Sequence, residues 1–469
     1  MVLNSLSFAL FFLIFLGILL VLPGKARKPW LFLGNCLYYF SWERRAFLLL
    51  LLSAWMIWAC GMAMERYTKK KPFLVIPVVW NVLLLLVFRY AGLLDGLFHP
   101  AGEPGLISFS RLAAPVGISF YTLRCISYMA DVYRGTIPAE KSFLNVFLYV
   151  SFFPQIISGP IERPGNFFRE LSAFETVPLR NFERIRRGFL LFVWGLFQKI
   201  VIAERLAVAA STVLSDFTAF GFWELLIGTA AYLLQVYCDF AGYSDMSRGI
   251  SAMMGFSTMR NFRQPFLAPG IRSLWRRWHI GLTSWLTDYV YIPLGGSRKG
   301  LLRKYLNITA AFLLSGLWHG STLNYAFWGL LNAGFQILED QGERRGLRMP
   351  GVLGRIITLA EMHFSSIFFG AGGLMRGFRI VRQMFTHFAL PDSWSFGLVP
   401  GNWAVLLAGL VILLIVDMLH EQGVGILDRT ASLPLPLRWA LMHGLFWAVI
   451  MLGIYGVGYD TSGFIYTQF

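Results

Sequence analysis

Apolar runs recur along the whole chain and are separated by short polar segments. A transmembrane helix needs about 20 mostly apolar residues. The runs that meet this length best are 5–22, 46–64, 73–94, 188–210, 220–238, 352–374, 402–420 and 436–457. Shorter or more polar runs occupy 30–41, 114–130, 143–158, 280–296, 305–318 and 322–338. The pattern predicts an all-α polytopic membrane protein with about eleven transmembrane helices, plus re-entrant or interfacial helices around a central tunnel.

Two of the shorter segments are expected not to cross the membrane. Segment 280–296 holds an aspartate, a proline and a glycine pair, a composition typical of re-entrant backbone that protein or a water-filled cavity surrounds. Run 305–318 has about 14 residues, hence about 21 Å of helix, against a hydrocarbon core of about 30 Å. We therefore expect His319, which follows this run, to lie inside the membrane near the tip of a hairpin. Without a visible linker or repeat, residues 1–469 are predicted to form a single domain.

Composition agrees with a membrane protein. Of the 469 residues, 56% are hydrophobic and 14% charged, and the mean hydropathy is +0.59. The net charge of +16 would suggest nucleic-acid binding in a soluble protein, but the basic residues gather in short segments such as 25–28, 66–71 and 298–304. This distribution follows the positive-inside rule and favours contact with anionic membrane lipids. We expect a multi-pass protein of the cell inner or plasma membrane, with these segments in the cytoplasm and no nucleic-acid partner.

The most informative polar residue is His319, in the segment LLSGLWHGS. A neutral imidazole in a partly desolvated site is suited to take the proton of an attacking hydroxyl. Ionisable groups at membrane depth are functional candidates by default. Gly316 and Gly320 on either side allow a backbone or a substrate to come close. The alternative is a structural histidine bonded to a carbonyl group, and the residues alone leave both open.

His279, in the segment SLWRRWHI, is the second catalytic candidate. It would line the same cavity and orient a substrate or the base. Arg276 and Arg277 would face an anionic donor such as a carrier phosphopantetheine, and Trp278 and Trp318 are further candidates for lining the tunnel or binding substrate. The alternative is that the arginines and tryptophans anchor the chain at the membrane boundary.

A third polar group follows the run 220–238, in the segment VYCDFAGYSDM. Asp239, Tyr243 and Asp245 either line the tunnel wall or pair with a basic residue such as Arg248, and pairing is the favoured interpretation because buried carboxylates need partners. The remaining histidines lack the spacing of metal ligands to a carboxylate or cysteine, so no metal site is predicted.

These segments resemble the membrane-bound O-acyltransferase family, and within it the bacterial alginate O-acetyltransferase-like branch. The combination of RRWHI with LSGLWHG is the most specific part of the resemblance. The similar segments are PVGISFYTLRCISYMADVYRG (115–135), FFPQIISGPIERPGNF (152–167), YCDFAGYSDMSRGISAMMGF (237–256), NFRQPFLAPGIRSLWRRWHIGLTSWLTDYVYIPLGGSRKG (261–300) and FLLSGLWHGSTLNYAFWG (312–329).

The resemblance implies an O-acyltransferase that moves an acyl group, here acetyl, through a membrane tunnel to hydroxyls of an extracytoplasmic polysaccharide. The implied donor is cytoplasmic acetyl-CoA or an acyl carrier, with no bound cofactor, and an extracytoplasmic SGNH-type partner is expected to complete the transfer where it is not direct. His319 corresponds to the near-central histidine of the family's tunnel and His279 to the second motif histidine. One departure is visible: relatives often read FFRA where residues 368–371 read FFGA. Arg376 or Arg379 is a candidate to replace the missing arginine.

The tail GFIYTQF (463–469) resembles the terminal motif of this branch and a relay peptide of the teichoic acid D-alanylation system. The phenol of Tyr466 would accept the acyl group as an ester and pass it to a partner. The alternative is an aromatic anchor at the membrane interface.

Two other functions stay open at this point. A transporter or flippase of a lipid-linked sugar would use His279 and His319 as proton-coupled sites, although the internal repeats typical of transporters are not evident. D-alanyl transfer to teichoic acid is the other alternative, since the resemblance does not identify the acyl group or the acceptor.

Overall fold

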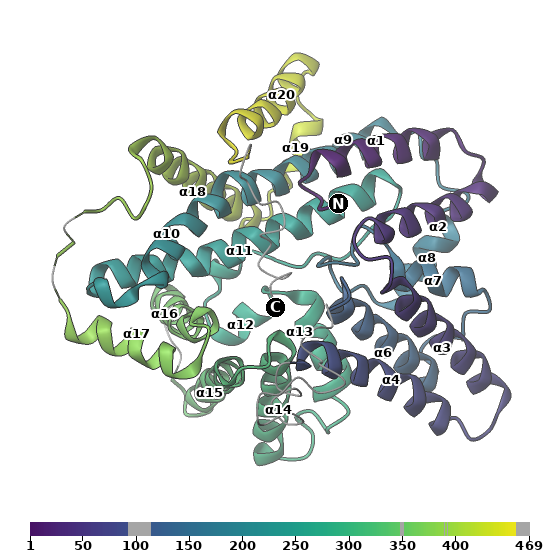
Figure 1. The fold of residues 1–469 in the computed structure, drawn as a ribbon, viewed down its shortest axis with the longest axis horizontal. Coiled ribbons are helices and arrows are strands. Elements are labelled where there is room, and N and C mark those ends of the chain that lie inside the picture. Colours follow the sequence, from purple (N-terminus) through teal and green to yellow (C-terminus); the bar gives the residue numbers. More distant parts are fainter. Residues whose placement is uncertain (92–113, 348–350, 389, 392, 456–469) are drawn as a thin grey trace, which may run out of the picture. The chain divides into compact units, whose positions relative to one another are not determined.

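The computed structural model describes residues 1–91, 114–347, 351–388, 390–391 and 393–455. Within these residues the chain folds into helices and forms no strand (Figure 1). The α-helices are α1 Leu6–Val21, α2 Gly24–Phe40, α3 Phe47–Arg66, α4 Lys71–Arg89, α6 Ile118–Arg134, α7 Phe143–Ser151, α8 Pro164–Ala173, α9 Phe182–Leu196, α10 Glu204–Ser215, α11 Phe222–Met253, α12 Ile271–Trp275, α13 Ile280–Leu286, α14 Leu301–His319, α15 Leu323–Arg344, α16 Gly351–Gly370, α17 Leu374–Thr386, α18 Pro400–Glu421, α19 Ile426–Ala431 and α20 Leu435–Leu452. The predicted all-α fold is confirmed.

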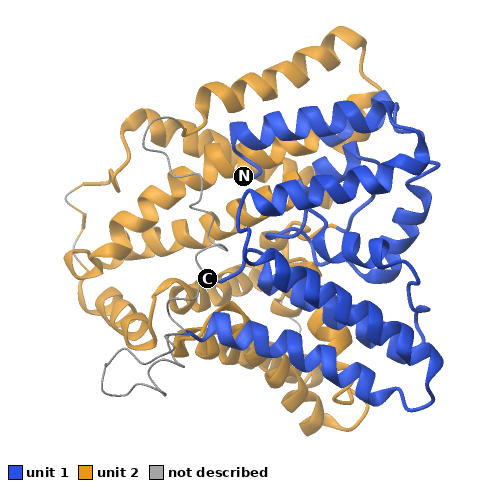
Figure 2. Ribbon diagram, turned by 45° about the vertical axis from the view of Figure 1, so that its right-hand side comes forward, with its two compact units in different colours: residues 1–189, 247–259, 461–469 blue, residues 190–246, 260–460 orange. Residues whose placement is uncertain are grey.

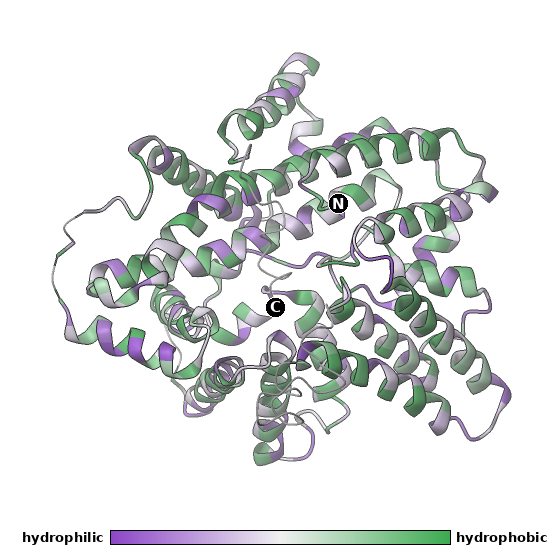
Figure 3. Ribbon diagram, in the orientation of Figure 1, coloured by the Kyte–Doolittle hydropathy of each residue, from purple (hydrophilic) through white to green (hydrophobic). Residues whose placement is uncertain are grey.

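Several helices have the length and hydropathy of membrane spans. By these criteria 6 of the described helices could cross a membrane: α3, α4, α11, α16, α18 and α20. Figure 3 shows the long apolar stretches along α1, α3 and α4 and the more polar surface of α17. Only 6% of the apolar window of α20 is buried inside the protein, so most of its apolar surface is available to lipid. The polytopic membrane protein is confirmed, and the number of about eleven spans stays a prediction.

The described residues form two compact units, which are described separately. Of the described residues, unit 1 holds 1–189 and 247–259, and unit 2 holds 190–246 and those from 260 to 455 (Figure 2). The long helices α9 and α11 each contribute residues to both units. The prediction of a single domain over 1–469 stays a prediction.

In unit 1, two predicted segments have different bounds. The segment 30–41 is the end of α2, which begins at Gly24, so the basic residues 25–28 lie in a helix and not in a loop. Lys28 pairs with Glu175 at 2.9 Å, which supports a charged first turn.

The predicted run 143–158 also ends early, because α7 stops at Ser151 and irregular buried backbone follows. Buried irregular backbone needs hydrogen-bond partners. The fully buried guanidinium of Arg124 supplies them, since it donates to the carbonyl oxygens of Tyr149 at 2.8 Å and Pro160 at 3.3 Å.

Two predicted spans reach further than the apolar runs. The run 188–210 corresponds to α9 and α10 joined by a π-helical segment, Phe197–Ala203. The run 220–238 is the first half of α11, which has 32 residues and continues past its aspartates. The helix continues because the carboxylate of Asp239 finds a partner inside unit 2, the ammonium group of Lys199 in the π-helical segment.

The helix that carries His319 is longer than predicted. α14 has 19 residues, and at about 1.5 Å per residue it measures about 28 Å, close to the hydrocarbon thickness. The predicted length of about 14 residues for this helix is therefore wrong, and helix length no longer supports a position of His319 inside the membrane. The helix starts earlier because Gly300, at φ 84°, turns the chain there, and Lys304 in its first turns pairs with Asp340 at 2.5 Å. Burial, and not helix length, must decide whether His319 lies in the interior.

Segment 280–296 is not one continuous helix, and its re-entrant or interfacial position stays a prediction. α13 has 7 residues, and a π-helical segment, Thr287–Tyr291, and turns follow it. Gly295 and Gly296 have φ of 112° and 55°, which glycine adopts at little cost. The side-chain amide of Asn307 on α14 donates to the carbonyl oxygen of Gly296 at 2.9 Å and holds the turn against the helix.

Close packing of α14 against α15 makes Gly316 sensitive to substitution. A Cβ at Gly316 would lie 2.2 Å from the carbonyl oxygen of Tyr325, whereas a Cβ at Gly334 on α15 would meet nothing within 4 Å. Gly316→Ala is expected to cost about 1–3 kcal/mol, the usual cost of overpacking. Thermal denaturation of the purified protein in detergent should show a lower Tm.

Gly334→Ala is the matched control for this prediction. Alanine has the higher helix propensity and there is space for its methyl group, so the Tm should stay or rise. An unchanged Tm for Gly316→Ala would contradict the close packing of the two helices.

Candidate active site

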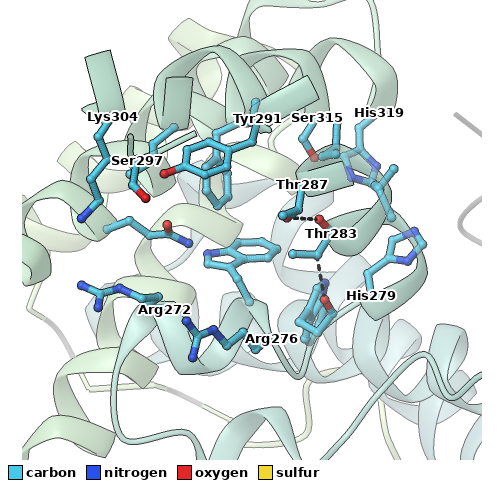
Figure 4. Close-up of a pocket in the computed structure, with 18 residues that line it drawn as sticks. Arg272, Arg276, His279, Thr283, Thr287, Tyr291, Ser297, Lys304, Ser315 and His319 are labelled. Carbon is cyan, nitrogen blue, oxygen red and sulfur yellow. Dashed lines mark hydrogen bonds between the residues drawn. The ribbon is translucent and has the colours of Figure 1, made fainter. Parts of the chain in front are cut away.

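A cavity of about 390 Å³ lies in unit 2, and both candidate histidines line it (Figure 4). Its volume falls within the range of small-molecule sites, about 300–1,000 Å³. The lining residues come from α12 to α15 and the turns between them: Arg272, Trp275, Arg276, Trp278, His279, Leu282, Thr283, Leu286, Thr287, Tyr291, Ser297, Lys304, Ile308, Ala311, Phe312, Ser315, His319 and Gln336. In Figure 4 the histidines lie on the right of the cavity, and Lys304 and Arg272 on the left.

His319 is the last residue of α14 and is 4% exposed. Aromatic rings surround its imidazole: the ring centroids of Trp318, Trp328 and Phe369 lie at 4.9, 5.4 and 5.1 Å. Such walls exclude water and lower the local dielectric, which strengthens any polar interaction made in the cavity. His319 is thus buried and lines the cavity because of its packing and not because its helix is short, and its catalytic role stays a prediction.

His279 lies at the turn between α12 and α13 and is 2% exposed. Its backbone is left-handed, with φ 44° and ψ 51°, a conformation that is uncommon for residues other than glycine. Phe240 of α11 packs edge-on against the imidazole, with ring centroids 4.6 Å apart. Non-glycine residues in this conformation cluster at functional sites, where the surrounding structure holds them in place.

Asn261 holds His279, although no motif or spacing in the sequence points to this contact. The Asn261 side-chain oxygen lies 3.2 Å from Nδ1 of His279 and accepts from the backbone N–H of Gly281 at 3.0 Å. Asn261 is fully buried. It belongs to the segment NFRQPF that carries part of the family resemblance, but nothing in its spacing connects it with a histidine 18 residues away.

The left side of the cavity is cationic. Arg272, Arg276 and Lys304 line it, and Asp340 just behind accepts hydrogen bonds from Lys304 at 2.5 Å and from Arg344 at 2.8 Å. Burial would raise the pKa of Asp340, but these bonds outweigh burial and hold the pKa well below its usual range. The carboxylate therefore stays ionised at neutral pH and holds the ammonium group of Lys304 in place.

Of the two adjacent arginines, only Arg276 lines the cavity. Among the described residues, its guanidinium makes no hydrogen bond or ion pair. Arg277 does not line the cavity and pairs with Glu421 at 2.7 Å, and contact of either arginine with the donor stays a prediction. Consecutive residues of a helical turn leave the axis in different directions, which separates the pair.

Some of the residues predicted to line the tunnel line this cavity, and others do not. Trp278 lines the cavity, whereas Trp318 is not among its lining residues, although its ring centroid lies 6.1 Å from that of His279. Asp239, Tyr243 and Asp245 do not line this cavity, and a place for them in the wall of a tunnel stays a prediction. Within unit 2, the carboxylate of Asp239 pairs with the ammonium group of Lys199, and the carboxylate of Asp245 accepts a hydrogen bond from the side-chain amide of Gln198 at 3.3 Å. Tyr243 is buried in the same unit.

Local packing explains the glycine in the FFGA segment, where relatives often have arginine. A Cβ at Gly370 would lie 2.4 Å from the ring of Tyr232, so this packing has no room for a side chain at that position. Arg376 donates to the carbonyl oxygen of Leu214 and Arg379 lies over the ring of Phe217, and neither lines the cavity. The described residues contain no cluster of histidine, cysteine or carboxylate suited to a metal ion.

A helical membrane protein with two buried histidines at one cavity has the features of a membrane-embedded transferase. The chain belongs to the membrane-bound O-acyltransferase family, whose profile matches residues 35–350. This membership confirms the predicted family of O-acyltransferases.

Three relatives show the range within this family. The probable alginate O-acetylase of Pseudomonas syringae is 36% identical over 70% of this chain and 64% of its own length. The probable alginate O-acetylase of Pseudomonas aeruginosa is 34% identical over 82% of this chain and 75% of its own length. The peptidoglycan O-acetyltransferase of Helicobacter pylori is 30% identical over 78% of this chain and 76% of its own. The match thus spans just under two thirds of the Pseudomonas syringae protein.

Proposed function

We propose that the protein transfers an acetyl group from a cytoplasmic thioester donor, acetyl-CoA or an acyl carrier, to hydroxyls of an extracytoplasmic polysaccharide. The supporting observation is that one cavity in unit 2 is lined both by His279 and His319 and by the cations Arg272, Arg276 and Lys304. The names of the relatives support acetyl as the acyl group and a cell-surface glycan as the acceptor. The membrane would be the inner or plasma membrane.

The proposed reaction needs one base and no cofactor. The acceptor hydroxyl oxygen attacks the thioester carbonyl carbon, a C–O bond forms and the C–S bond breaks. His319 takes the hydroxyl proton during attack and returns it to the leaving sulfur, so the products are an acetate ester and a free thiol. The aromatic rings around His319 keep water from competing for the acetyl group.

The cationic side of the cavity fits the donor. Ser297, which precedes the basic segment 298–304, and Lys304, its last residue, both line the cavity, and the positive-inside rule assigns this segment to the cytoplasm. The phosphates of CoA or of a carrier phosphopantetheine would meet Arg276 there, and charge-assisted hydrogen bonds to phosphate are stronger than neutral ones.

Arg276→Ala should therefore raise the KM for the donor about 10-fold, a loss of about 1.4 kcal/mol, with little change in kcat. The interaction is made equally in the ground and transition states. Initial rates against donor concentration measure this effect. Arg277→Ala is the matched control, because its ion pair with Glu421 lies outside the cavity, and it should leave KM in place. Equal KM values for both variants would remove Arg276 from the donor site.

The function is tested with purified protein in liposomes, labelled acetyl-CoA and an acceptor polysaccharide on the opposite side. Acetyl ester formation on the polymer that stops with His319→Ala supports the proposal. Label that crosses the membrane without ester formation would favour a transporter. An aminoacyl ester in place of acetyl would favour D-alanyl transfer.

Transfer through an extracytoplasmic SGNH-type partner is the second part of the proposal, with Tyr466 as the relay. Tyr466 lies outside the described residues. Tyr466→Phe keeps the aromatic ring and deletes the nucleophilic oxygen, so polymer acetylation should stop while the donor still binds.

Mass spectrometry of the C-terminal peptide after incubation with donor should show an acetyl adduct in the wild type and none in Tyr466→Phe. Tyr455→Phe, at a tyrosine that is 53% exposed, is the control and should retain both the adduct and transfer. Full polymer acetylation by Tyr466→Phe would reduce the tail to an anchor.

A further inference from the structure

Asn261 forms hydrogen bonds on both sides of its side-chain amide, all within unit 2. Its Nδ2 donates to Oγ of Ser244 on α11 at 3.1 Å. Its Oδ1 faces the backbone N–H of Gly281 at 3.0 Å and Nδ1 of His279 at 3.2 Å. Asn261, Ser244 and His279 are 0%, 1% and 2% exposed, so water does not compete for these bonds.

The backbone of Gly281 determines which way the amide points. A backbone N–H is only a donor, so the atom that faces it must be the amide oxygen and not the amide nitrogen. The same oxygen faces Nδ1 of His279, and an oxygen without a hydrogen can only accept there. Nδ1 of His279 must therefore carry a proton, and in the neutral ring the acceptor nitrogen is Nε2.

The main chain of Asn261 supports the same arrangement. Its carbonyl oxygen accepts from the backbone N–H of Ile280 at 2.8 Å. Residues 279 to 281 are thus held at three points by one asparagine, and the left-handed backbone of His279 lies among them. A strained conformation persists only where its surroundings determine it, and here they are the bonds of Asn261.

We propose that Asn261 is a positioning residue that locks His279 in the Nδ1–H tautomer, so that Nε2 is the acceptor His279 offers to a hydroxyl or thiol in the cavity. Ser244 anchors the amide from α11. This inference rests on the proposed acetyl transfer for its kinetic test, but the ring state of His279 is measurable without any substrate.

The ionisable groups around His279 are few. α11 places Phe240 against the imidazole and Ser244 against the amide of Asn261, and α14 presents Trp318 and, on the same side of the cavity, the titratable His319. The other charged groups that line the cavity are Arg272, Arg276 and Lys304. A carboxylate next to Nδ1 would therefore be a new charge at this position.

Asn261→Asp tests the proposal with little change of shape. A carboxylate oxygen still accepts from Gly281 and His279, and the second oxygen accepts from the Ser244 hydroxyl, which can donate. The negative charge favours the protonated imidazole. As the pH is lowered, activity that needs the neutral ring should therefore be lost sooner, at a higher pH than in the wild type. The acid limb of the pH–rate profile then shifts to higher pH. Asn261→Ala should lower kcat by about 10²- to 10⁴-fold, and Asn261→Asp should regain a measurable part of it above the new limb.

Asn35 provides a matched control. It is 1% exposed, donates to Oγ of Ser151 at 3.0 Å and accepts from the backbone N–H of Phe153 at 3.1 Å, with no histidine bonded to it. Asn35→Asp makes the same chemical change at an equally buried amide and should leave the acid limb in place. A limb that moves equally in both aspartate variants would overturn the proposal.

Nitrogen NMR of histidine-labelled protein in membranes reads the ring state directly, with the His279 signals identified by their loss in His279→Gln. The wild type should show protonated Nδ1 and unprotonated Nε2, and Asn261→Ala should lose this preference. Three results would each overturn the proposal. The first is the opposite tautomer in the wild type, and the second is a pH–rate profile of Asn261→Asp that superimposes on that of the wild type. The third is a folded Asn261→Asp protein that is no more active than Asn261→Ala. The expected tautomer in a protein that transfers no acetyl group would count against the proposed function alone.

Discussion

Replacement of His319 by alanine is expected to lower acetyl transfer by about 10²- to 10⁴-fold or more, the usual contribution of a general base. The imidazole is 4% exposed and lines the cavity, and alanine leaves no group there that can take the proton of the attacking hydroxyl. Donor binding should persist, because the cations of the cavity are untouched. Polymer acetylation in cells that express each variant at equal level measures the loss.

His363→Ala is the matched control for this experiment. His363 is a partly buried histidine on α16 whose Nε2 lies 2.8 Å from the hydroxyl of Thr229, and it does not line the cavity. Both variants should elute as folded protein in detergent, and only His319→Ala should lose transfer. Wild-type acetylation by His319→Ala would end its assignment as the base.

The second large effect is expected at Lys199. Lys199 pairs with Asp239 inside unit 2, and their side chains are 2% and 4% exposed. Lys199→Met leaves the carboxylate buried without its main partner, and breaking a buried pair in this way costs about 3–5 kcal/mol. Because Lys199 lies in the π-helical segment, we expect the turn between α9 and α10 to loosen and the Tm in detergent to fall markedly.

A double variant and a surface pair complete this test. Lys199→Met with Asp239→Asn removes both charges and should recover much of the lost stability. Arg187→Ala breaks an exposed pair with Glu183, whose side chains are 42% and 37% exposed, and should cost under about 1 kcal/mol. Equal Tm values for Lys199→Met and Arg187→Ala would show that the buried pair contributes no special stability.

The positions of the helices could be read from the chain because the signal is local. Long apolar runs such as 402–420 became helices within a few residues of their predicted ends, since the bilayer requires every backbone group to be satisfied within the helix. The predictions were wrong where a polar side chain finds a partner far along the chain. α11 continues past 238 because Asp239 meets Lys199, and α14 begins before 305 because Lys304 meets Asp340.

By itself the sequence determined an all-α membrane protein, its family and the two histidines in their motifs, because apolar run length and motif spacing are properties of neighbouring residues. Only the tertiary structure decided which polar residues share the cavity with them. Arg276 lines it while Arg277 pairs with Glu421, and the aspartates of α11 pair away from it. Asn261 reaches His279 from 18 residues away through a side-chain oxygen. Side-chain direction and long-range pairing depend on how the helices pack, and no local pattern records that packing.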